Sequence, residues 1–176
     1  MTKEQLALEI YDTAHLTGKF LLRSGSFSSE YFDKYQFESR PDLLMEIAEH
    51  MLKILPDDYD LLAGLEMGGI PLATALSFKT GKPAVFVRKK AKEYGTAKLA
   101  EGPDIEGKRL LIIEDVITSG GQVVISSRDL KDRGALIVGA VCVIDRESGG
   151  REALAEKAIK LNSLFTMSEL KKIKGI

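Results

Sequence analysis

The chain has 176 residues, a length that suits one α/β domain with a full core or one domain with a small appendage. Hydrophobic residues make up 44% and charged residues 29%, which is ordinary for a soluble globular protein. The net charge of −1 argues against a general nucleic-acid-binding protein, which is usually basic overall or along one stripe. No apolar run approaches the ~20 residues that span a membrane, residues 1–10 lack a signal-peptide core, and the single Cys142 cannot form an internal disulfide, so we expect a reduced, cytoplasmic protein that binds neither membrane nor nucleic acid.

The first forty residues predict a small N-terminal unit. A helix is expected over Thr2–His15, where the letters TKEQ are typical of a capping box. Short strands are expected at Phe20–Leu22 and Tyr31–Tyr35, on either side of a segment rich in glycine and serine. We interpret residues 1–40 as a hood over the carboxyl end of a sheet.

Strands and helices alternate through residues 41–176. A helix is expected to start near Pro41, because proline is favoured at the first helical position. The segment 88–107 has no apolar period and is interpreted as a long functional loop. The alternation predicts an α/β fold with a doubly wound, mostly parallel sheet, in a single domain over residues 1–176 with its core in 41–176. Strands are expected at 60–64, 83–87, 108–115, 135–145 and 159–166, and helices at 69–81, 120–134, 151–158 and 167–173.

One stretch, RLLIIEDVITSGGQ (residues 109–122), combines two features of a ligand site. An almost continuous apolar run, as in a central parallel strand, ends in the adjacent carboxylates of Glu114 and Asp115. The letters TSGG then lead into a helix N-terminus, whose free N–H groups favour a phosphate. Carboxylates repel a pure phosphate but accept hydrogen bonds from hydroxyl groups. The combination therefore predicts a sugar phosphate as the ligand.

The sequence lacks the common nucleotide-binding motifs. Neither G-x-x-x-x-G-K-[ST] nor G-x-G-x-x-G occurs in it. A phosphoacceptor aspartate, as in a response-regulator domain, is an alternative interpretation of Asp115. That alternative leaves both TSGG and the basic residues of 88–98 unexplained.

The letters LLIIEDVITSGG resemble the signature of the type I phosphoribosyltransferases, which bind phosphoribosyl pyrophosphate (PRPP). The resemblance implies that Glu114 and Asp115 hold the ribose hydroxyls and favour a cationic sugar, and it places Asp115 among the catalytic residues. It also implies that residues 118–121 cradle the 5′-phosphate. The PRPP-binding residues implied by this stretch are Glu114, Asp115, Val116, Ile117, Thr118, Ser119, Gly120, Gly121 and Gln122.

The basic segment VRKKAKEYG resembles the catalytic loop of the orotate phosphoribosyltransferases. Arg88, Lys89 and Lys92 match the family positions, and Lys92 falls on the lysine regarded as catalytic. Tyr94 replaces the histidine of the family pattern, which removes a possible cation but keeps a hydrogen-bond donor. The resemblance implies that these four residues contact PRPP and that the loop stabilises the departing pyrophosphate.

Three more stretches resemble segments of the same family. FLLRSGSFSSEYFD resembles the base-binding segment, and VIDRESGG contains an arginine that matches the contact to the orotate carboxylate, which suits a bidentate pair. The implied orotate-binding residues are Arg23, Phe32, Thr118 and Arg146. GLEMGGIPLATAL resembles the pyrophosphate loop, here Glu66, Met67, Gly68 and Gly69, and some members carry a lysine where this chain has Gly68.

The resemblance implies the reaction of orotate with PRPP to give orotidine 5′-phosphate and pyrophosphate. Mg²⁺ is implied on oxygen atoms of PRPP, and no direct protein ligand to the metal is expected. A homodimer is implied, with the loop 88–98 shared across its interface. Two alternatives stay open: a purine-type phosphoribosyltransferase, which should lack the Arg146 contact, and a PRPP-sensing regulator without enzymatic activity.

Overall fold

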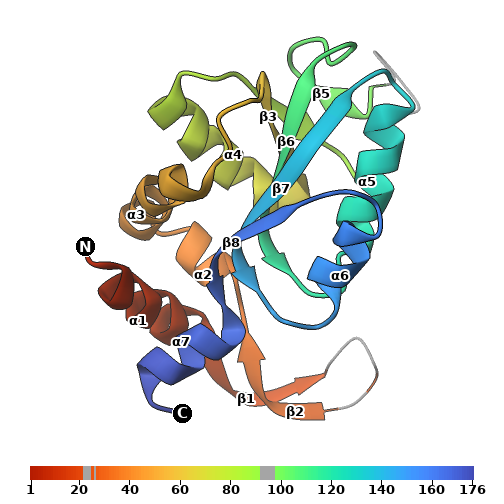
Figure 1. Ribbon diagram of the computed structural model, residues 1–176. Coiled ribbons are helices and arrows are strands. Elements are labelled where there is room, and N and C mark those ends of the chain that lie inside the picture. Colours follow the sequence, from red (N-terminus) through yellow and green to blue (C-terminus); the bar gives the residue numbers. More distant parts are fainter. Residues whose placement is uncertain (22–24, 26, 92–97) are drawn as a thin grey trace.

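The structure is a computed structural model that describes residues 1–21, 25, 27–91 and 98–176. A six-stranded sheet lies at its centre with helices on both faces, and a hairpin with further helices lies at one end (Figure 1). This arrangement confirms the predicted α/β fold with a doubly wound, mostly parallel sheet. Within the described ranges, no helix is both long and apolar enough to cross a membrane. Arg23, Lys92 and Tyr94 lie outside the described residues.

The central sheet has the strand order β5-β4-β3-β6-β7-β8. The chain starts in the middle of the sheet at β3, moves to β4 on one side, and then crosses to β6 on the other. Such a switch point leaves a crevice at the carboxyl ends of the strands, where ligands bind in open α/β sheets. The strands are β3 (Leu61–Leu65), β4 (Ala84–Val87), β5 (Ala100–Glu101), β6 (Arg109–Ile117), β7 (Leu136–Asp145) and β8 (Leu161–Thr166), all parallel except β5, which pairs antiparallel with β4.

Alternate residues of β6 enter two separate cores, because side chains along a strand point to opposite faces. Leu111 and Ile113 pack in the core beneath α3 and α4, whereas Leu110 and Ile112 pack in the core beneath α5 and α6. Both faces are covered, so the strand needs a continuous apolar run. The covering helices are α3 (Pro41–Met51) with the 3₁₀ turn η1 (Leu52–Ile54), α4 (Glu66–Thr80), α5 (Gly121–Lys131) and α6 (Gly150–Ala155).

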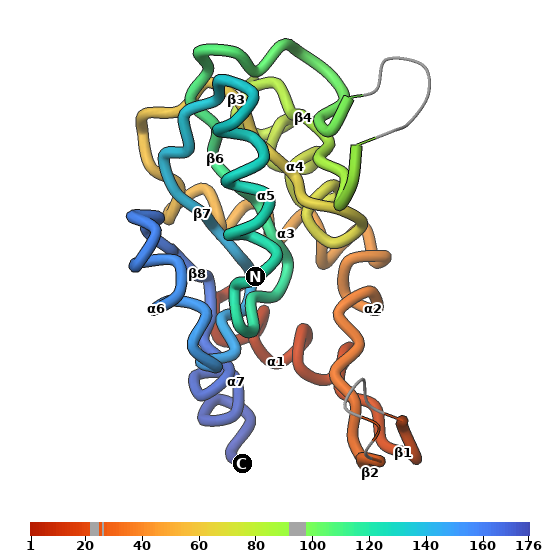
Figure 2. The backbone as a smooth tube through the Cα atoms, turned by 90° about the vertical axis from the view of Figure 1, so that its right-hand side faces the viewer, coloured from red at the N-terminus to blue at the C-terminus, as the bar shows by residue number. Residues whose placement is uncertain are grey.

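The hood consists of the first four elements of the chain, and the C-terminal helix packs beside it. The predicted capping box is present: the Gln5 N–H donates to the Thr2 hydroxyl over 3.2 Å, and the Thr2 N–H donates to the Gln5 side chain over 2.9 Å. Figure 1 and Figure 2 both show the hairpin at the carboxyl end of the parallel strands, as predicted. The elements are α1 (Lys3–Ala14), β1 (His15–Leu21), β2 (Phe27–Phe32), α2 (Tyr35–Glu38) and α7 (Met167–Lys174).

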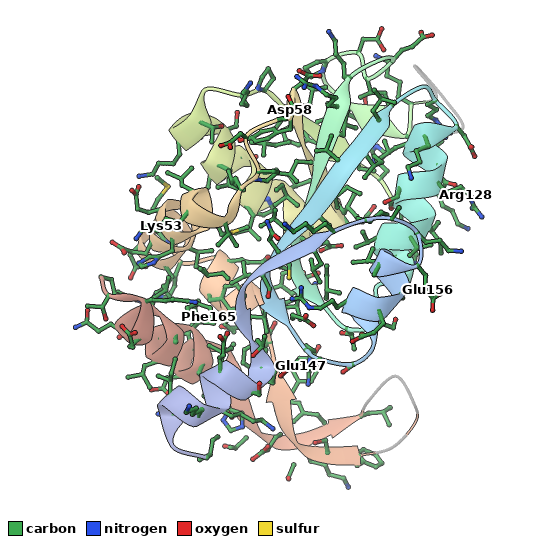
Figure 3. All side chains as sticks on the ribbon, in the orientation of Figure 1. Lys53, Asp58, Arg128, Glu147, Glu156 and Phe165 are labelled. Atoms are coloured by element: carbon green, nitrogen blue, oxygen red, sulfur yellow. The ribbon has the colours of Figure 1, made fainter. Side chains whose placement is uncertain are left out.

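Charged side chains fix the two ends of the sheet. At the amino end of β6, the Arg109 guanidinium donates to the Asp60 carboxylate over 2.8 Å and also pairs with Asp58. At the carboxyl end, Glu147 accepts a hydrogen bond of 2.8 Å from the N–H of Ser168, which ties the segment after β7 to α7. Figure 3 labels Asp58 and Glu147 at these opposite ends.

The structure differs from the predicted elements in places where distant pairing decides the outcome. β1 begins at His15 because residues 15–17 already pair with β2, and the chain at Tyr35 turns into α2 instead of ending a strand. Within the expected long loop, Ala100 and Glu101 form β5 by pairing with β4. β6 runs beyond Asp115 to Ile117, because it still pairs with β7 there.

Gly69 lies where α4 passes closest to β6. A Cβ atom on this residue would lie 2.2 Å from the carbonyl oxygen of Ile113. Replacing glycine by alanine inside a helix normally stabilises it by about 0.5–1 kcal/mol. Here the backbone contact reverses the sign, and we expect Gly69→Ala to lower the free energy of unfolding by about 1–3 kcal/mol, as overpacking does. Urea denaturation measures this change.

Gly121→Ala is the matched control, because a Cβ atom there would meet its nearest atom, the Ser119 hydroxyl oxygen, only at 3.8 Å. The control should unfold at the same urea concentration as the wild-type protein or a slightly higher one. A Gly69→Ala protein as stable as the control would contradict the close packing of α4 on β6.

Candidate active site

A pocket of about 740 Å³ lies at the carboxyl end of β6. Its wall comes from four parts of the chain: the β6–α5 connection, the start of α4, the segment after β4, and the hood residues just after β2. These parts meet at the switch point of the sheet, where a ligand site is expected. The wall residues are Lys34, Tyr35, Leu65, Glu66, Gly68, Lys89, Glu114, Val116, Ile117, Thr118, Ser119, Gly120, Gly121, Gln122, Val123 and Ile125.

The connection between β6 and α5 presents a helix N-terminus to this pocket. α5 begins at Gly121, directly after Gly120, whose φ of 73° turns the chain into the helix. The first N–H groups of a helix have no acceptor within the helix and lie at the positive end of its dipole. Thr118 and Ser119 are exposed beside them and add hydroxyl donors. A phosphate group can therefore bind here.

The two adjacent carboxylates are separated by the geometry of the strand. Glu114 and Asp115 both belong to β6, so their side chains point to opposite faces. Glu114 lines the pocket, whereas the Asp115 side chain has no exposed surface and faces the start of α4. Gly68 makes room for it, since a Cβ atom at Gly68 would lie 2.0 Å from the Asp115 Oδ2 atom. In this structure Glu114 therefore faces the pocket directly, and the Asp115 carboxylate lies behind the pocket wall.

Asp115 belongs to a buried group of charges that includes two hood residues. The Lys34 Nζ atom lies 2.6 Å from the Asp115 Oδ2 atom, and Glu38 is only 6% exposed. Burial, together with hydrogen bonding to Asp115 and its negative charge, raises the pKa of Glu38 to about 10. Burial and the charge of Asp115 likewise raise the pKa of Glu114 well above its usual range. The cluster therefore holds protons at neutral pH that exposed carboxylates would lose.

Lys34 and Glu38 do not figure in the sequence-based site. The sequence predicts a strand over Tyr31–Tyr35. An extended chain would hold Lys34 and Glu38 far apart, so neither residue is assigned to the site. In the structure, Lys34 is the N-cap of α2 and Glu38 its last residue, so one turn of helix brings both toward Asp115. The sequence did contain one signal for them: Lys34 and Glu38 are charged and lie four residues apart, the spacing of one helical turn, directly after the aromatic end of β2.

A second pocket, of about 350 Å³, lies between the hood and the segment after β7. The backbone N–H of Arg146 donates to the carbonyl oxygen of Ile117 over 2.9 Å, and Ile117 lines the first pocket. This hydrogen bond fixes the second pocket next to the first. The wall residues are Tyr11, His15, Ser28, Glu30, Tyr31, Phe32, Arg146, Met167 and Lys171.

The structure therefore gathers the sequence-based site residues into two places. Phe32 and Arg146 share the second pocket, while Thr118, also expected to bind orotate, lines the first. Lys89 reaches the first pocket, and its backbone N–H donates to the Glu66 carboxylate. Four of the predicted site residues that the structure describes belong to neither wall: Met67, Gly69, Arg88 and Asp115.

Arg88 and Glu66 show how the start of the basic loop is held. The Arg88 Nε atom lies 3.3 Å from the Glu101 carboxylate, so the antiparallel pair β4–β5 anchors the first residue of the loop. Glu66 has a φ of 51°, which is uncommon for a residue with a side chain. Backbone strain of this kind persists where surrounding contacts determine it, and it clusters at ligand sites.

Comparison with known proteins agrees with this geometry. A family model described as a phosphoribosyl transferase domain matches residues 35–164. An orotate phosphoribosyltransferase of a Nocardioides species is 52% identical over 165 residues, which cover 94% of this chain and 92% of the relative. The crystal structure of Mycobacterium tuberculosis orotate phosphoribosyltransferase with Fe(III) dicitrate has a TM-score of 0.87 at 29% identity and covers 96% of this chain and 98% of its own. The same enzyme crystallised with PRPP has a TM-score of 0.81 at 27% identity, with coverage of 96% and 98%. The chain belongs to the orotate phosphoribosyltransferase family.

Proposed function

We propose that the protein transfers the 5-phosphoribosyl group of PRPP to orotate, giving orotidine 5′-phosphate and pyrophosphate in pyrimidine biosynthesis. The observation that carries the proposal is the pair of neighbouring pockets joined by the Arg146–Ile117 hydrogen bond. One pocket has the groups that a phosphorylated sugar needs. The other has an arginine and aromatic rings that suit a planar carboxylated base.

In the first pocket, residues 118–121 at the start of α5 bind the 5′-phosphate. Glu114 accepts hydrogen bonds from the ribose hydroxyls and, once ionised, favours the positive charge that develops on the sugar as the C1–O bond breaks. The Asp115 carboxylate is buried behind Lys34, and it contributes to this site by forming an ion pair with the Lys34 ammonium group. Gln122, Val116 and Ile117 complete the wall around the sugar.

The leaving pyrophosphate lies between the start of α4 and the basic loop. Glu66 and Gly68 line the pocket on the α4 side, and Lys89 lines it on the loop side. Lys92, with Arg88 and Lys89, stabilises the negative charge of the departing group, and Tyr94 donates a hydrogen bond to it. The closing of such a loop would also exclude water from the reacting carbon.

Mg²⁺ would be brought in with PRPP and would need few protein ligands. The wall fits such an ion, because the Glu114 carboxylate and the Thr118 and Ser119 hydroxyl groups offer oxygen atoms. The ion would supply positive charge that offsets part of the pyrophosphate charge.

The orotate ring lies in the second pocket. Arg146 pairs with the carboxylate, which distinguishes orotate from uracil, and Phe32 of the same wall contacts the ring. A purine base has no carboxylate, so it leaves Arg146 without a partner.

The working unit is a homodimer in which the loop 88–98 reaches the neighbouring subunit. Exposed apolar side chains on α4 and β4 support this proposal: Phe78 is 81% exposed, Met67 69% and Phe86 37%. A contiguous exposed apolar surface often marks an interface.

The function is tested by the loss of orotate absorbance with purified protein, PRPP and Mg²⁺. We expect turnover that requires Mg²⁺ and falls by about 100-fold or more in Lys92→Ala, as when one donor to a developing charge is removed. Purine bases in competition test the alternative. Ribosylation of a purine without turnover of orotate would replace the proposed substrate, and PRPP binding without any turnover would favour a regulator.

Arg146→Gln tests the base pocket. The loss of a charged hydrogen bond should lower kcat/KM for orotate by about 10- to 100-fold, while KM for PRPP stays nearly unchanged. The ratio of orotate to uracil turnover should fall with it. Arg133→Gln is the control, because the Arg133 side chain donates to the backbone oxygen of Asp129 and belongs to neither pocket wall. An unchanged preference for orotate would remove Arg146 from this role.

Glu38→Gln tests the protonated acid cluster through stability. Folded Glu38 keeps its proton up to about pH 10, whereas in the unfolded chain its pKa returns to the ordinary 4.5. The folded state then binds more protons between these values, so its stability falls as pH rises. Glutamine is neutral at every pH. The free energy of unfolding of the variant minus that of the wild-type protein should therefore rise steadily from about pH 5 to about pH 9.

Urea denaturation at several pH values measures this difference. Glu49→Gln is the control of opposite sign, because the hydrogen bond and charge of Lys79 lower the pKa of the exposed Glu49. Its difference from the wild-type protein should not rise with pH. A flat difference for Glu38→Gln would mean that Glu38 is ionised in the folded protein.

A further inference from the structure

Lys34 separates the Asp115 charge from the ligand pocket. The Asp115 side chain has no exposed surface, whereas the Lys34 side chain is 32% exposed and lines the pocket wall. Its Nζ atom lies 2.6 Å from the Asp115 Oδ2 atom. A ligand that enters this part of the pocket therefore meets an ammonium group, with the carboxylate behind it.

The ammonium group lies beside the start of α4. A Cβ atom at Gly68 would lie 2.0 Å from the Asp115 Oδ2 atom, and Lys34 pairs with this same oxygen. Lys34 and Gly68 are therefore neighbours in the wall, in the part assigned above to pyrophosphate. An ammonium group has three N–H donors, and one of them suffices for Asp115. Two donors remain for a ligand.

The charge of the wall makes this cation important. Glu66 and Glu114 both line the pocket and would repel a pyrophosphate when ionised, and in the described part of the wall only Lys34 and Lys89 are cationic. Lys34 stays charged, because although burial by itself lowers its pKa, the charge and hydrogen bond of Asp115 raise it above its usual value. A fixed cation supported from behind is already oriented before the ligand arrives.

We propose that Lys34 binds the pyrophosphate group of PRPP and that Asp115 is a positioning residue that holds the Lys34 ammonium group at the pocket wall. This inference rests on the proposed function, in which pyrophosphate is the leaving group. It gives the hood a part in PRPP binding in addition to its part in binding the base.

Binding of two fragments of PRPP separates this role from others. Isothermal titration of pyrophosphate with Mg²⁺ should show affinity at least about tenfold weaker in Lys34→Met, as for the loss of one charged contact. Ribose 5-phosphate, which lacks the pyrophosphate, should bind within about twofold of wild type. Lys82→Met is the matched control: the Lys82 Nζ atom lies 5.6 Å from the Tyr59 ring centre, much as Lys34 lies 5.1 Å from Tyr35, but Lys82 follows the far end of α4.

A double-mutant cycle tests the positioning role of Asp115. Lys34→Met alone leaves a buried carboxylate without its partner and can destabilise the fold, whereas Lys34→Met/Asp115→Asn leaves no unpaired charge. Pyrophosphate has no hydroxyl groups for Asp115 to bind. If Asp115 acts through Lys34, the two substitutions should weaken pyrophosphate binding by no more together than Lys34→Met does alone. Thermal melting of each variant confirms that folded protein is compared.

The inference would be overturned if, in a folded Lys34→Met protein, the binding of pyrophosphate and of ribose 5-phosphate weakened equally. It would also be overturned if the binding of neither fragment weakened. Additive effects of the two substitutions would overturn the role of Asp115. The wild-type orotate assay distinguishes these failures from failure of the proposed function. If the wild-type protein turns over orotate but Lys34→Met leaves the affinity for pyrophosphate unchanged, only the inference is rejected. Pyrophosphate binding that depends on Lys34, without orotate turnover, supports the inference and rejects orotate as the substrate.

Discussion

The two-residue period of β6 is the constraint on which both the core and the site depend. Along the strand, it sends Leu110 and Ile112 to one core and Leu111 and Ile113 to the other, which holds the helices on both faces. At the carboxyl end, the same period sends Glu114 into the pocket and Asp115 beneath α4. The alternation of side chains along one strand therefore fills both cores and also places Glu114 and Asp115 in two different environments.

The division of the acids solves an electrostatic problem. A site for a phosphorylated sugar needs acceptors for hydroxyl groups, yet negative charge near a pyrophosphate costs binding energy. Burial keeps protons on Glu38 and Glu114 to higher pH, and Lys34 neutralises Asp115. The result is a group of three carboxyls and one ammonium whose net charge is far less negative than its composition suggests.

The second consequence of the fold is that distant segments share one crevice. The hood, the start of α4, the β6–α5 connection and the segment after β7 all reach the carboxyl end of the sheet (Figure 1). The Ile117–Arg146 hydrogen bond follows from the parallel pairing of β6 with β7, so the sheet itself sets the distance between the two pockets. A rigid sheet suits a reaction that requires two substrates in fixed register.

The sequence by itself determined the fold class, the family resemblance and the start of a helix directly after β6. These features are encoded locally: an apolar run for a central strand, glycines at a helix start, and letters in an unbroken order, and the comparisons confirm the resemblance. Tertiary structure alone decided the partners of Asp115, the short strand β5 and the joining of two pockets. Each of these depends on residues far apart in the chain, such as Lys34 with Asp115 or Phe86 with Glu101, and local pattern carries no information on such contacts. Lys34 entered the site only because the hood folds over the sheet and brings one turn of helix against the end of β6.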